Sequence, residues 1–181
     1  MEVERLQRDY DVEVRFAPFL LDPSIPPEGK PRKPQTRPDD PPTAMELRAQ
    51  SLGIGFTRGR TFTPNSHLSL EAAEFAAEHG AGLGFHRSMF KAFFEDMVDI
   101  SDIDNVVRIG AGAGLDETDL RRALESGHYR EQVDDGIQWS REIGVTGVPT
   151  FIFDDKYGIV GAQDYTVFQS VMEKLGARPK A

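Results

Sequence analysis

The chain has 181 residues, of which 39% are hydrophobic and 28% charged, and its formal net charge is -9 at pH 7. This length is enough for one well-buried core with an inserted subdomain. The negative charge argues against binding to nucleic acid, whose phosphates need a positive surface. No window approaches the roughly 20 apolar residues of a membrane span, and the N-terminus lacks the apolar core of a secretory signal. We therefore expect a cytoplasmic protein that binds no membrane.

Cysteine is absent from the chain. This excludes disulfides, thiolate metal sites and a thiol nucleophile within these residues.

The first predicted elements are a short helix and a strand. Residues 2–9 have a helical pattern but no N-cap before them, so they resemble only the end of a helix. Residues 11–16 alternate, with Val12, Val14 and Phe16 on one face, which predicts a strand. We therefore expect the chain to begin midway through a helix that leads into a strand.

A proline-rich arm is predicted next. Residues 23–42 hold eight of the twelve prolines, together with the basic residues Lys30, Arg32, Lys33 and Arg37. So much proline with alternating charge cannot build a core, and the segment is expected to be extended where it is ordered. The basic cluster could contact an anionic partner, but a solvated loop is the favoured interpretation.

Residues 43–143 are predicted to be mostly helical. Helices are expected near residues 44–52, 66–80, 85–94, 117–126 and 129–143, and another contains Ile103, Val106 and Val107. The run Ser101–Asp104 resembles an N-cap followed by acidic first-turn residues. Asp116 is the predicted N-cap of the helix at 117–126, and Gly144 is the predicted stop of the last helix. The run Gly110–Gly114 resembles a phosphate loop. Because it follows a helix and lacks a Lys-Ser/Thr pair, we interpret it as a loosely packed helix end.

The C-terminal part of the chain begins with a turn-rich run. Val148-Pro149 leads into an apolar strand at residues 150–153, followed by a turn, a second strand at 159–160 and a helix near 164–175. Proline at the start of a strand removes a ladder donor. It suits that place if the peptide bond is locked in one isomer, and the cis form costs only about 0.5–1 kcal/mol.

This order of elements is typical of the C-terminal half of a thioredoxin-like fold. Two sequence motifs resemble the DsbA family of thiol–disulfide oxidoreductases: Gly-Val-Thr-Gly-Val-Pro-Thr-Phe at residues 144–151 and Val-Gly-Ala-Gln at residues 160–163. Within this family, the motifs are similar to those of the FrnE-like and 2-hydroxychromene-2-carboxylate isomerase-like proteins. The resemblance implies an α/β fold, a thioredoxin-like sheet formed by residues 1–42 and 144–181, with a helical insertion at residues 43–143.

The resemblance also implies an element that these residues lack. Families of this kind carry the reactive residue after the first strand, usually in Cys-x-x-Cys, and this chain contains neither. We expect the first strand and the reactive residue upstream of Met1. Two alternatives are a natural truncation that binds its substrate without redox chemistry, and a sheet that another chain completes.

Substrate-binding residues follow from the same resemblance. Val148 and Pro149 would offer backbone groups to an extended peptide or to glutathione, as an added strand. Gln163 and Asp164, at the start of the last helix, would hold the γ-glutamyl end of glutathione. Asp164 alone is more simply the N-cap of that helix.

Two further candidates lie at the start of a predicted helix. Asn65-Ser66 resembles an Asn-Ser/Thr pair that lines the reactive pocket in the isomerase-like branch, so Asn65 could donate to a thiolate or a carbonyl. An ordinary helix cap is an equal interpretation. His67 could act as an acid or base near pH 7, although a single histidine in a first turn usually has no such role. The other histidines show no ligand spacing, so no metal site is expected.

The predicted function is therefore that of a DsbA-like thiol–disulfide oxidoreductase whose substrate is held at Val148-Pro149. The residues given cannot perform the exchange, because the attacking thiolate is absent. One alternative is a glutathione-dependent isomerase or transferase, with glutathione as cosubstrate and no bound cofactor. The other is a non-catalytic module that binds peptides or forms a homodimer. The expected partners are a dithiol or disulfide peptide, or a glutathione-type substrate.

Overall fold

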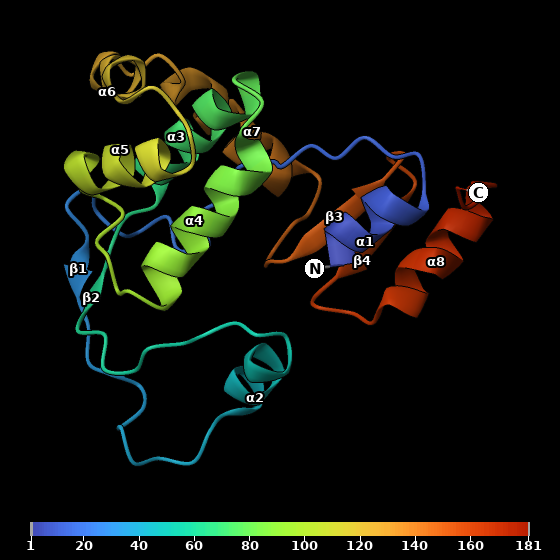
Figure 1. The fold of residues 1–181 in the computed structure, drawn as a ribbon, viewed down its shortest axis with the longest axis horizontal. Helices are drawn as coiled ribbons and strands as arrows, with labels where there is room; N and C mark the ends of the chain where they lie inside the picture. The colour runs from blue at the N-terminus through green and yellow to red at the C-terminus, as the bar shows by residue number, and fades with distance from the viewer. Residues whose placement is uncertain (1, 181) are drawn as a thin grey trace. The chain divides into compact units, whose positions relative to one another are not determined.

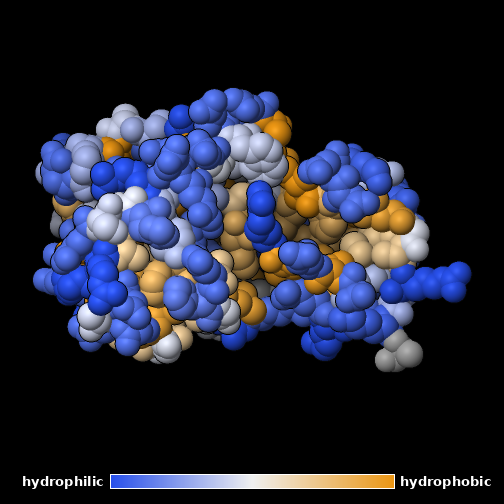
Figure 2. Space-filling view, turned by 90° about the horizontal axis from the view of Figure 1, so that it is seen from above, coloured by the Kyte–Doolittle hydropathy of each residue, from blue (hydrophilic) through white to orange (hydrophobic). Residues whose placement is uncertain are grey.

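The computed structural model describes residues 2–180, which form two compact units. Unit 1 comprises the chain up to Leu21 and again from Ile137 onward, and unit 2 comprises Asp22–Gly136. Figure 1 follows the chain through both. No helix among residues 2–180 combines the length and the apolar composition that crossing a membrane requires. On the face drawn in Figure 2, hydrophilic residues cover most of the surface and apolar residues emerge in separate patches.

Unit 1 is built on a hairpin packed against helices. Its regular elements are α1 (Glu2–Asp9), β3 (Thr150–Phe153), β4 (Tyr157–Val160) and α8 (Tyr165–Lys174). β3 and β4 are antiparallel, with Thr150 opposite Val160 and Phe153 opposite Tyr157. Asp154 and Asp155 form the turn with positive φ angles, which aspartate tolerates better than most residues. The core of the unit consists of buried side chains from all these elements: Leu6, Tyr10, Ile159, Tyr165, Phe168, Val171 and Met172.

Polar contacts join α1 to α8 at the edge of this core. The Tyr165 hydroxyl donates to Asp9 Oδ2 at 2.8 Å, and the Lys180 N–H donates to the Asp9 carbonyl at 2.7 Å. The guanidinium of Arg5 lies 4.0 Å from the centre of the Tyr165 ring. Burial, together with the bond to Asp9, raises the pKa of Tyr165 to about 12. The same bond holds the pKa of Asp9 below its ordinary value.

The strand predicted for residues 11–16 is wrong. Residues 11–20 have no regular secondary structure, and the isolated bridge between Tyr10 and Pro179 lies just before them. Alternation does give alternate burial, since Val12 and Val14 are partly buried and their neighbours are more exposed, but Phe16 is exposed. An alternating segment becomes a strand only when a second strand hydrogen-bonds to it, and none lies beside this one among residues 2–180.

Unit 2 contains a helical bundle with its own core. Its helices are α3 (His67–Glu78), α4 (Gly82–Phe94), α5 (Ile103–Gly112) and α6 (Glu117–Ser126), and α7 (Arg130–Glu142) begins in it. The predicted N-cap at Asp116 is confirmed, and within the predicted run Ser101–Asp104 the N-cap is Asp102. Asp102 Oδ1 accepts from the Asn105 N–H at 3.1 Å, and Asp116 Oδ1 accepts from the Asp119 N–H at 2.9 Å. These local bonds explain why the helix starts could be located from sequence.

The glycine run at residues 110–114 is a helix end, as predicted, but it is not loosely packed. A Cβ atom on Gly110 would lie 2.3 Å from Leu120 Cδ2 and 3.4 Å from Leu115 Cδ1. Leu120 is fully buried. Gly110 therefore allows α5 and α6 to approach closely, whereas Gly112, two residues later in the same helix, has no neighbour within 4 Å of its Cβ position.

A long segment with two short strands and one helix precedes the helical bundle of unit 2. β1 (Lys30–Pro31) pairs antiparallel with β2 (Phe62–Thr63), and α2 (Ala44–Ser51) lies between them in the chain. We call residues 30–63 the β1–β2 arm; Figure 1 shows α2 within it, away from α3 to α6. α2 begins with a capping box, in which Thr43 Oγ1 accepts from the Glu46 N–H and Glu46 Oε2 accepts from the Thr43 N–H. The ribbon of β1 and β2 has no counterpart in the sequence-based prediction.

Candidate functional site

The loop between α7 and β3 carries the predicted substrate-binding pair. Gly144 ends α7 with a φ of 82°, and the Val148–Pro149 peptide bond is cis. Thr150 Oγ1 donates to the Gly147 carbonyl at 2.7 Å, which fixes the last turn of the loop. The Gly161 N–H donates to the Pro149 carbonyl at 2.8 Å, so the hairpin pairing continues by one residue beyond β3.

Val148 presents an unpaired backbone beside this fixed loop. The residue is 58% exposed, and neither its N–H nor its C=O forms a hydrogen bond within the described residues. Because Pro149 and Gly161 form a hydrogen-bonded pair, the backbone groups of Thr150 and Ile152 point away from β4. β3 has no second strand beside it in the part of the chain that the structure covers. Within residues 2–180, Val148 and the outer edge of β3 together form one continuous edge without a partner strand; we call it the free edge.

Gln163 and Asp164 lie close to this loop in unit 1. Gly161, which bonds to Pro149, is two residues before Gln163, and Gln163 Nε2 donates to the Val160 carbonyl at 3.0 Å. Asp164 is at the N-cap of α8 with extended backbone, but its side chain accepts no capping bond from the first turn of the helix. The structure thus brings four of the predicted residues to one end of the hairpin.

Asn65 belongs to unit 2, and its side chain is engaged at both ends. Nδ2 donates to the Ile25 carbonyl at 2.7 Å, and Oδ1 accepts from the His67 N–H at 2.8 Å. Asn65 therefore joins the start of α3 to the segment before β1. Ser66, the N-cap of α3, makes no side-chain capping bond.

His67 lies between two carboxylates of unit 2. Nδ1 is 3.1 Å from Glu71 Oε1 and Nε2 is 2.9 Å from Asp134 Oδ1. Carboxylates only accept, so the ring donates to both partners only when it is protonated. Glu71 is 2% exposed, its Oε2 has no partner within the described residues, and Arg130 Nε lies 3.9 Å from its Oε1.

The sequence analysis missed both carboxylate partners of His67. The spacing of His67 and Glu71, one helical turn apart, was a usable signal. Asp134 is 67 residues from His67 in the chain, and no local pattern links the two.

Unit 2 has surface cavities, and none of the predicted site residues lines the two described next. One of about 380 Å³ is lined by His79, Asp119, Arg122, Ala123, Ser126 and His128. The other, of about 250 Å³, lies in the β1–β2 arm and is lined by Pro38, Asp40, Pro42, Glu46, Gln50, Phe56 and Arg58. Within residues 2–180, no three side chains of histidine, aspartate or glutamate are placed to hold a metal ion.

Comparison with known proteins places this geometry in a family. Residues 1–173 match the model of the DSBA-like thioredoxin domain. An uncharacterized protein, YwbO of Bacillus subtilis (strain 168), is 30% identical over 164 residues, which are 90% of this chain and 82% of that protein. The ClpXP adapter protein SpxH of Halalkalibacterium halodurans is 25% identical over 127 residues, which are 66% of this chain and 40% of that protein.

A solved structure is similar as well. A probable DsbA oxidoreductase from Streptomyces coelicolor superposes with a TM-score of 0.67 at 25% identity, over 76% of this chain and 60% of that chain. The chain thus spans less than two thirds of both the adapter protein and this oxidoreductase. The comparisons confirm the predicted family resemblance and the thioredoxin-like fold class.

Proposed function

Because the chain belongs to the DSBA-like thioredoxin domain family, we propose that it aligns an extended peptide or disulfide substrate for thiol–disulfide exchange at the Val148–Pro149 loop. The observation that carries this proposal is the free edge formed by Val148 and β3. The sequence of residues 144–151 supports membership of the FrnE-like branch of the family.

An extended peptide fits this edge as an added strand. Val148 offers one N–H and one C=O, and Thr150 and Ile152 offer further outward groups in the same direction. Each hydrogen bond formed to a peptide contributes about 0.5–1.5 kcal/mol net. Backbone pairing gives affinity that depends little on the peptide's sequence, while exposed side chains such as Ile152 supply some selectivity.

The chemical step itself needs a thiolate that attacks one sulfur of a disulfide and releases the other. None of the 181 residues is a cysteine. The exchange therefore requires a thiol from outside these residues. The contribution of these residues is to bind the substrate and orient it for attack.

A backbone-blocked peptide tests this mode of binding. We expect a short cysteine-containing peptide to slow amide hydrogen exchange at Thr150 and Ile152. The same peptide with N-methyl groups on alternate residues is expected to bind about tenfold more weakly, because about two hydrogen bonds are lost. Nuclear magnetic resonance titration measures both effects. Equal affinity for the two peptides would rule out pairing with the β3 edge.

Two proline substitutions provide the matched control on the protein. Ile152→Pro removes an outward N–H from β3, and Val160→Pro removes an outward N–H from the far edge of β4. Peptide binding is expected to be lost only in Ile152→Pro. Loss in both variants would indicate general damage to the hairpin.

Glutathione is a second candidate ligand, favoured by the start of α8. This helix begins at Tyr165, and the backbone N–H groups of a helix N-terminus attract carboxylates. The bond between Gly161 and Pro149 places this helix start next to the proposed peptide edge. Glutathione could then span both, with its γ-glutamyl carboxylate at α8, as a glutathione-dependent isomerase or transferase requires.

Amide resonances of Tyr165 and Thr166 test this candidate. Glutathione at up to about 10 mM is expected to shift them, whereas the dipeptide Cys-Gly, which lacks the γ-glutamyl group, is expected not to. If glutathione has no effect, this candidate fails while the peptide-binding proposal is untouched.

A further inference from the structure

We propose that the cavity of about 380 Å³ in unit 2 binds an oxyanion of the phosphate type, held by Arg122, His79 and His128. We call it the α3–α6 cavity; its other lining residues are Asp119, Ala123 and Ser126. Its volume falls within the roughly 300–1,000 Å³ of ligand pockets. The site lies in unit 2 and does not depend on the free edge of unit 1.

One face of α6 supplies most of the lining of the cavity. Asp119, Arg122, Ala123 and Ser126 follow one another at intervals of three, one and three residues, which places them on the same side of a helix. α3 and α6 are in contact, and His79 is the C-cap residue of α3. The cavity therefore forms where two packed helices of the same unit meet.

The turn after α6 positions His128 at this cavity. Gly127 has a φ of 64°, and its N–H donates to the Leu124 carbonyl at 3.1 Å. The His128 N–H donates to the Ala123 carbonyl at 3.0 Å, and its ring meets the Tyr129 ring edge-on at a centroid distance of 4.8 Å. Within residues 2–180, neither ring nitrogen of His128 has a hydrogen-bond partner. Both are therefore available to a ligand.

The ring of His79 is held by its own helix. Nδ1 lies 2.8 Å from the Phe75 carbonyl, and the ring stacks on the Phe75 ring at a centroid distance of 4.0 Å. A carbonyl oxygen only accepts hydrogen bonds, so Nδ1 is the donor and carries a proton. Nε2 has no partner in the described part of the chain. It can donate to a ligand only when the ring is protonated.

Arg122 supplies a permanent positive charge. Its Nη1 donates to Asp119 Oδ1 at 3.0 Å, which leaves Nε and Nη2 for a ligand. Glu78, the residue before His79, does not line the cavity, and its carboxylate accepts from the Tyr129 hydroxyl. Since the charges of Arg122 and Asp119 cancel, each proton taken up by the two histidines adds a net positive charge to the cavity.

An anion fits these groups better than a metal ion does. Arginine donates hydrogen bonds and never accepts them. Within residues 2–180, no three side chains of histidine, aspartate or glutamate are placed to hold a metal ion. Hydrogen bonds from charged donors to an anion are roughly twice as strong as those between neutral groups. The donors of α3, α6 and the turn after α6 therefore favour a phosphate-type ligand.

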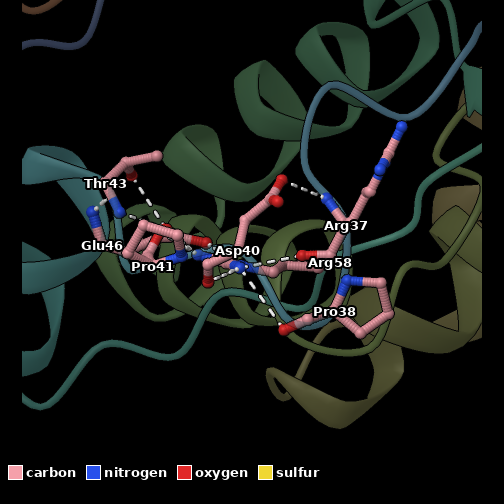
Figure 3. Close-up of polar contacts among 7 residues, drawn as sticks. All are labelled: Arg37, Pro38, Asp40, Pro41, Thr43, Glu46 and Arg58. Carbon is pink, nitrogen blue, oxygen red and sulfur yellow. Dashed lines mark hydrogen bonds and ion pairs between the residues drawn. The ribbon is translucent and has the colours of Figure 1, made fainter.

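The cavity in the β1–β2 arm offers an anion no comparable group. Its arginine, Arg58, uses every N–H of the guanidinium within the arm (Figure 3). Nε and Nη2 donate to the two carboxylate oxygens of Glu46, each at 2.7 Å, and Nη1 donates to the Asp40 carbonyl at 2.6 Å. Hydrogen bonds from Arg58 and Thr43 lower the pKa of Glu46 to about 2, so this carboxylate stays ionised near neutral pH. Arg122 differs from Arg58 in having donors to spare.

Histidine side-chain resonances test the site. The chain has four histidines, of which His79 and His128 line the cavity and His67 and His86 do not. Sodium sulfate added to about 20 mM, at constant ionic strength, is expected to shift the ring signals of His79 and His128 until they saturate. The signals of His67 and His86 are expected to stay in place. Equal shifts at all four histidines, or no shift at the cavity pair, would overturn the proposal.

The pH dependence of sulfate binding tests the part played by His79. Sulfate keeps its charge across the range in which histidines titrate, so only the protein changes. Because His79 Nε2 donates only when the ring is protonated, binding is coupled to proton uptake. The affinity is expected to be about tenfold higher near about pH 5.5 than near about pH 7.5. Equal affinities would overturn the role assigned to His79.

Two neighbouring arginines provide matched variants. Arg122→Gln removes the permanent charge and leaves Asp119 unpaired, so it is expected to raise the sulfate dissociation constant by about tenfold or more. The control is Arg121→Gln, the same change at the adjacent residue, which donates to Asp104 at 2.7 Å and does not line the cavity. It is expected to alter the constant by less than about twofold. Equal weakening by both variants would mean that only the overall charge matters, and would overturn the site.

Two further probes distinguish a free anion from the phosphate group of a larger ligand. We expect glycerol 3-phosphate to bind more tightly than inorganic phosphate, because the cavity has room for more than a single anion. Equal affinities would identify the free anion as the ligand of the same site. If neither probe shifts the signals of His79 and His128, the proposal fails.

Discussion

Replacing Phe168 by alanine is expected to destabilise unit 1 by about 3–5 kcal/mol. The Phe168 ring is 1% exposed and meets the rings of Phe151 and Phe153 edge-on, at centroid distances of 4.9 and 6.1 Å. Truncation removes buried apolar surface, leaves a cavity and breaks both aromatic pairs. Because typical domains are stable by only about 5–15 kcal/mol, this one change removes a large part of what holds α8 to the hairpin.

Urea unfolding measures the effect within unit 1. Trp139 is the only tryptophan in the chain and lies in this unit, so its fluorescence reports the relevant transition. Val167→Ala is the matched control, since Val167 is the adjacent residue of α8 and is 38% exposed. It is expected to cost less than about 1 kcal/mol. Similar losses in both variants would mean that Phe168 is not the centre of this core.

Alanine at Gly110 is expected to destabilise unit 2, whereas alanine at Gly112 is not. Each substitution gains about 1 kcal/mol in helix propensity over glycine. At Gly110 the new Cβ would lie 2.3 Å from Leu120 Cδ2, and Leu120 is fully buried and cannot move without disturbing its neighbours. Overpacking of this kind costs about 1–3 kcal/mol.

The difference between these two variants isolates the packing cost. Gly112 has no neighbour within 4 Å of its Cβ position. Both variants gain helix propensity, so this gain cancels when their unfolding free energies are subtracted and the packing cost at Gly110 remains. Chemical unfolding followed by circular dichroism, which reports the helices of unit 2, is expected to show Gly110→Ala less stable than Gly112→Ala by about 1–3 kcal/mol. Equal stability would show that α5 and α6 are not in close contact at Gly110.

The helices and the C-terminal hairpin could be predicted because their signals are local. Asp102 and Asp116 each bond to an N–H three residues later, and Gly144 adopts the positive φ that ends α7. The residues of β3 and β4 are separated only by a short turn that begins with Asp154 and Asp155. In each case the residues that cause the structure are neighbours in the sequence.

The features that could not be predicted depend on distant partners. The alternation of residues 11–16 is consistent with a strand, but pairing decides the outcome and no strand lies beside them within residues 2–180. Arg58 bonds to carbonyl groups 17–21 residues away. Carbonyl acceptors belong to every residue, so no side-chain pattern identifies them.

The candidate site was predictable to the same extent. The sequence motif around Val148 and Pro149 was enough to locate the loop. In the folded chain, the hairpin brings Gln163 and Asp164 to the same end of unit 1. For Asn65 and His67 the sequence showed the helix start. It did not show that Ile25, Glu71 and Asp134 occupy their polar atoms, because these contacts arise only when the elements of unit 2 pack.

The edge of β3, which has no partner strand within residues 2–180, also bears on aggregation. Thr150–Phe153 is uncharged, lacks proline and is rich in residues that favour strands, the composition that promotes pairing between identical strands of different molecules. Pro149 precedes the segment, and two aspartates, Asp154 and Asp155, follow it at once. Proline cannot extend the row of donors, and the carboxylates repel their counterparts in a neighbouring molecule. An edge this short, bounded in this way, can accept one guest strand and still resist growth into a fibril.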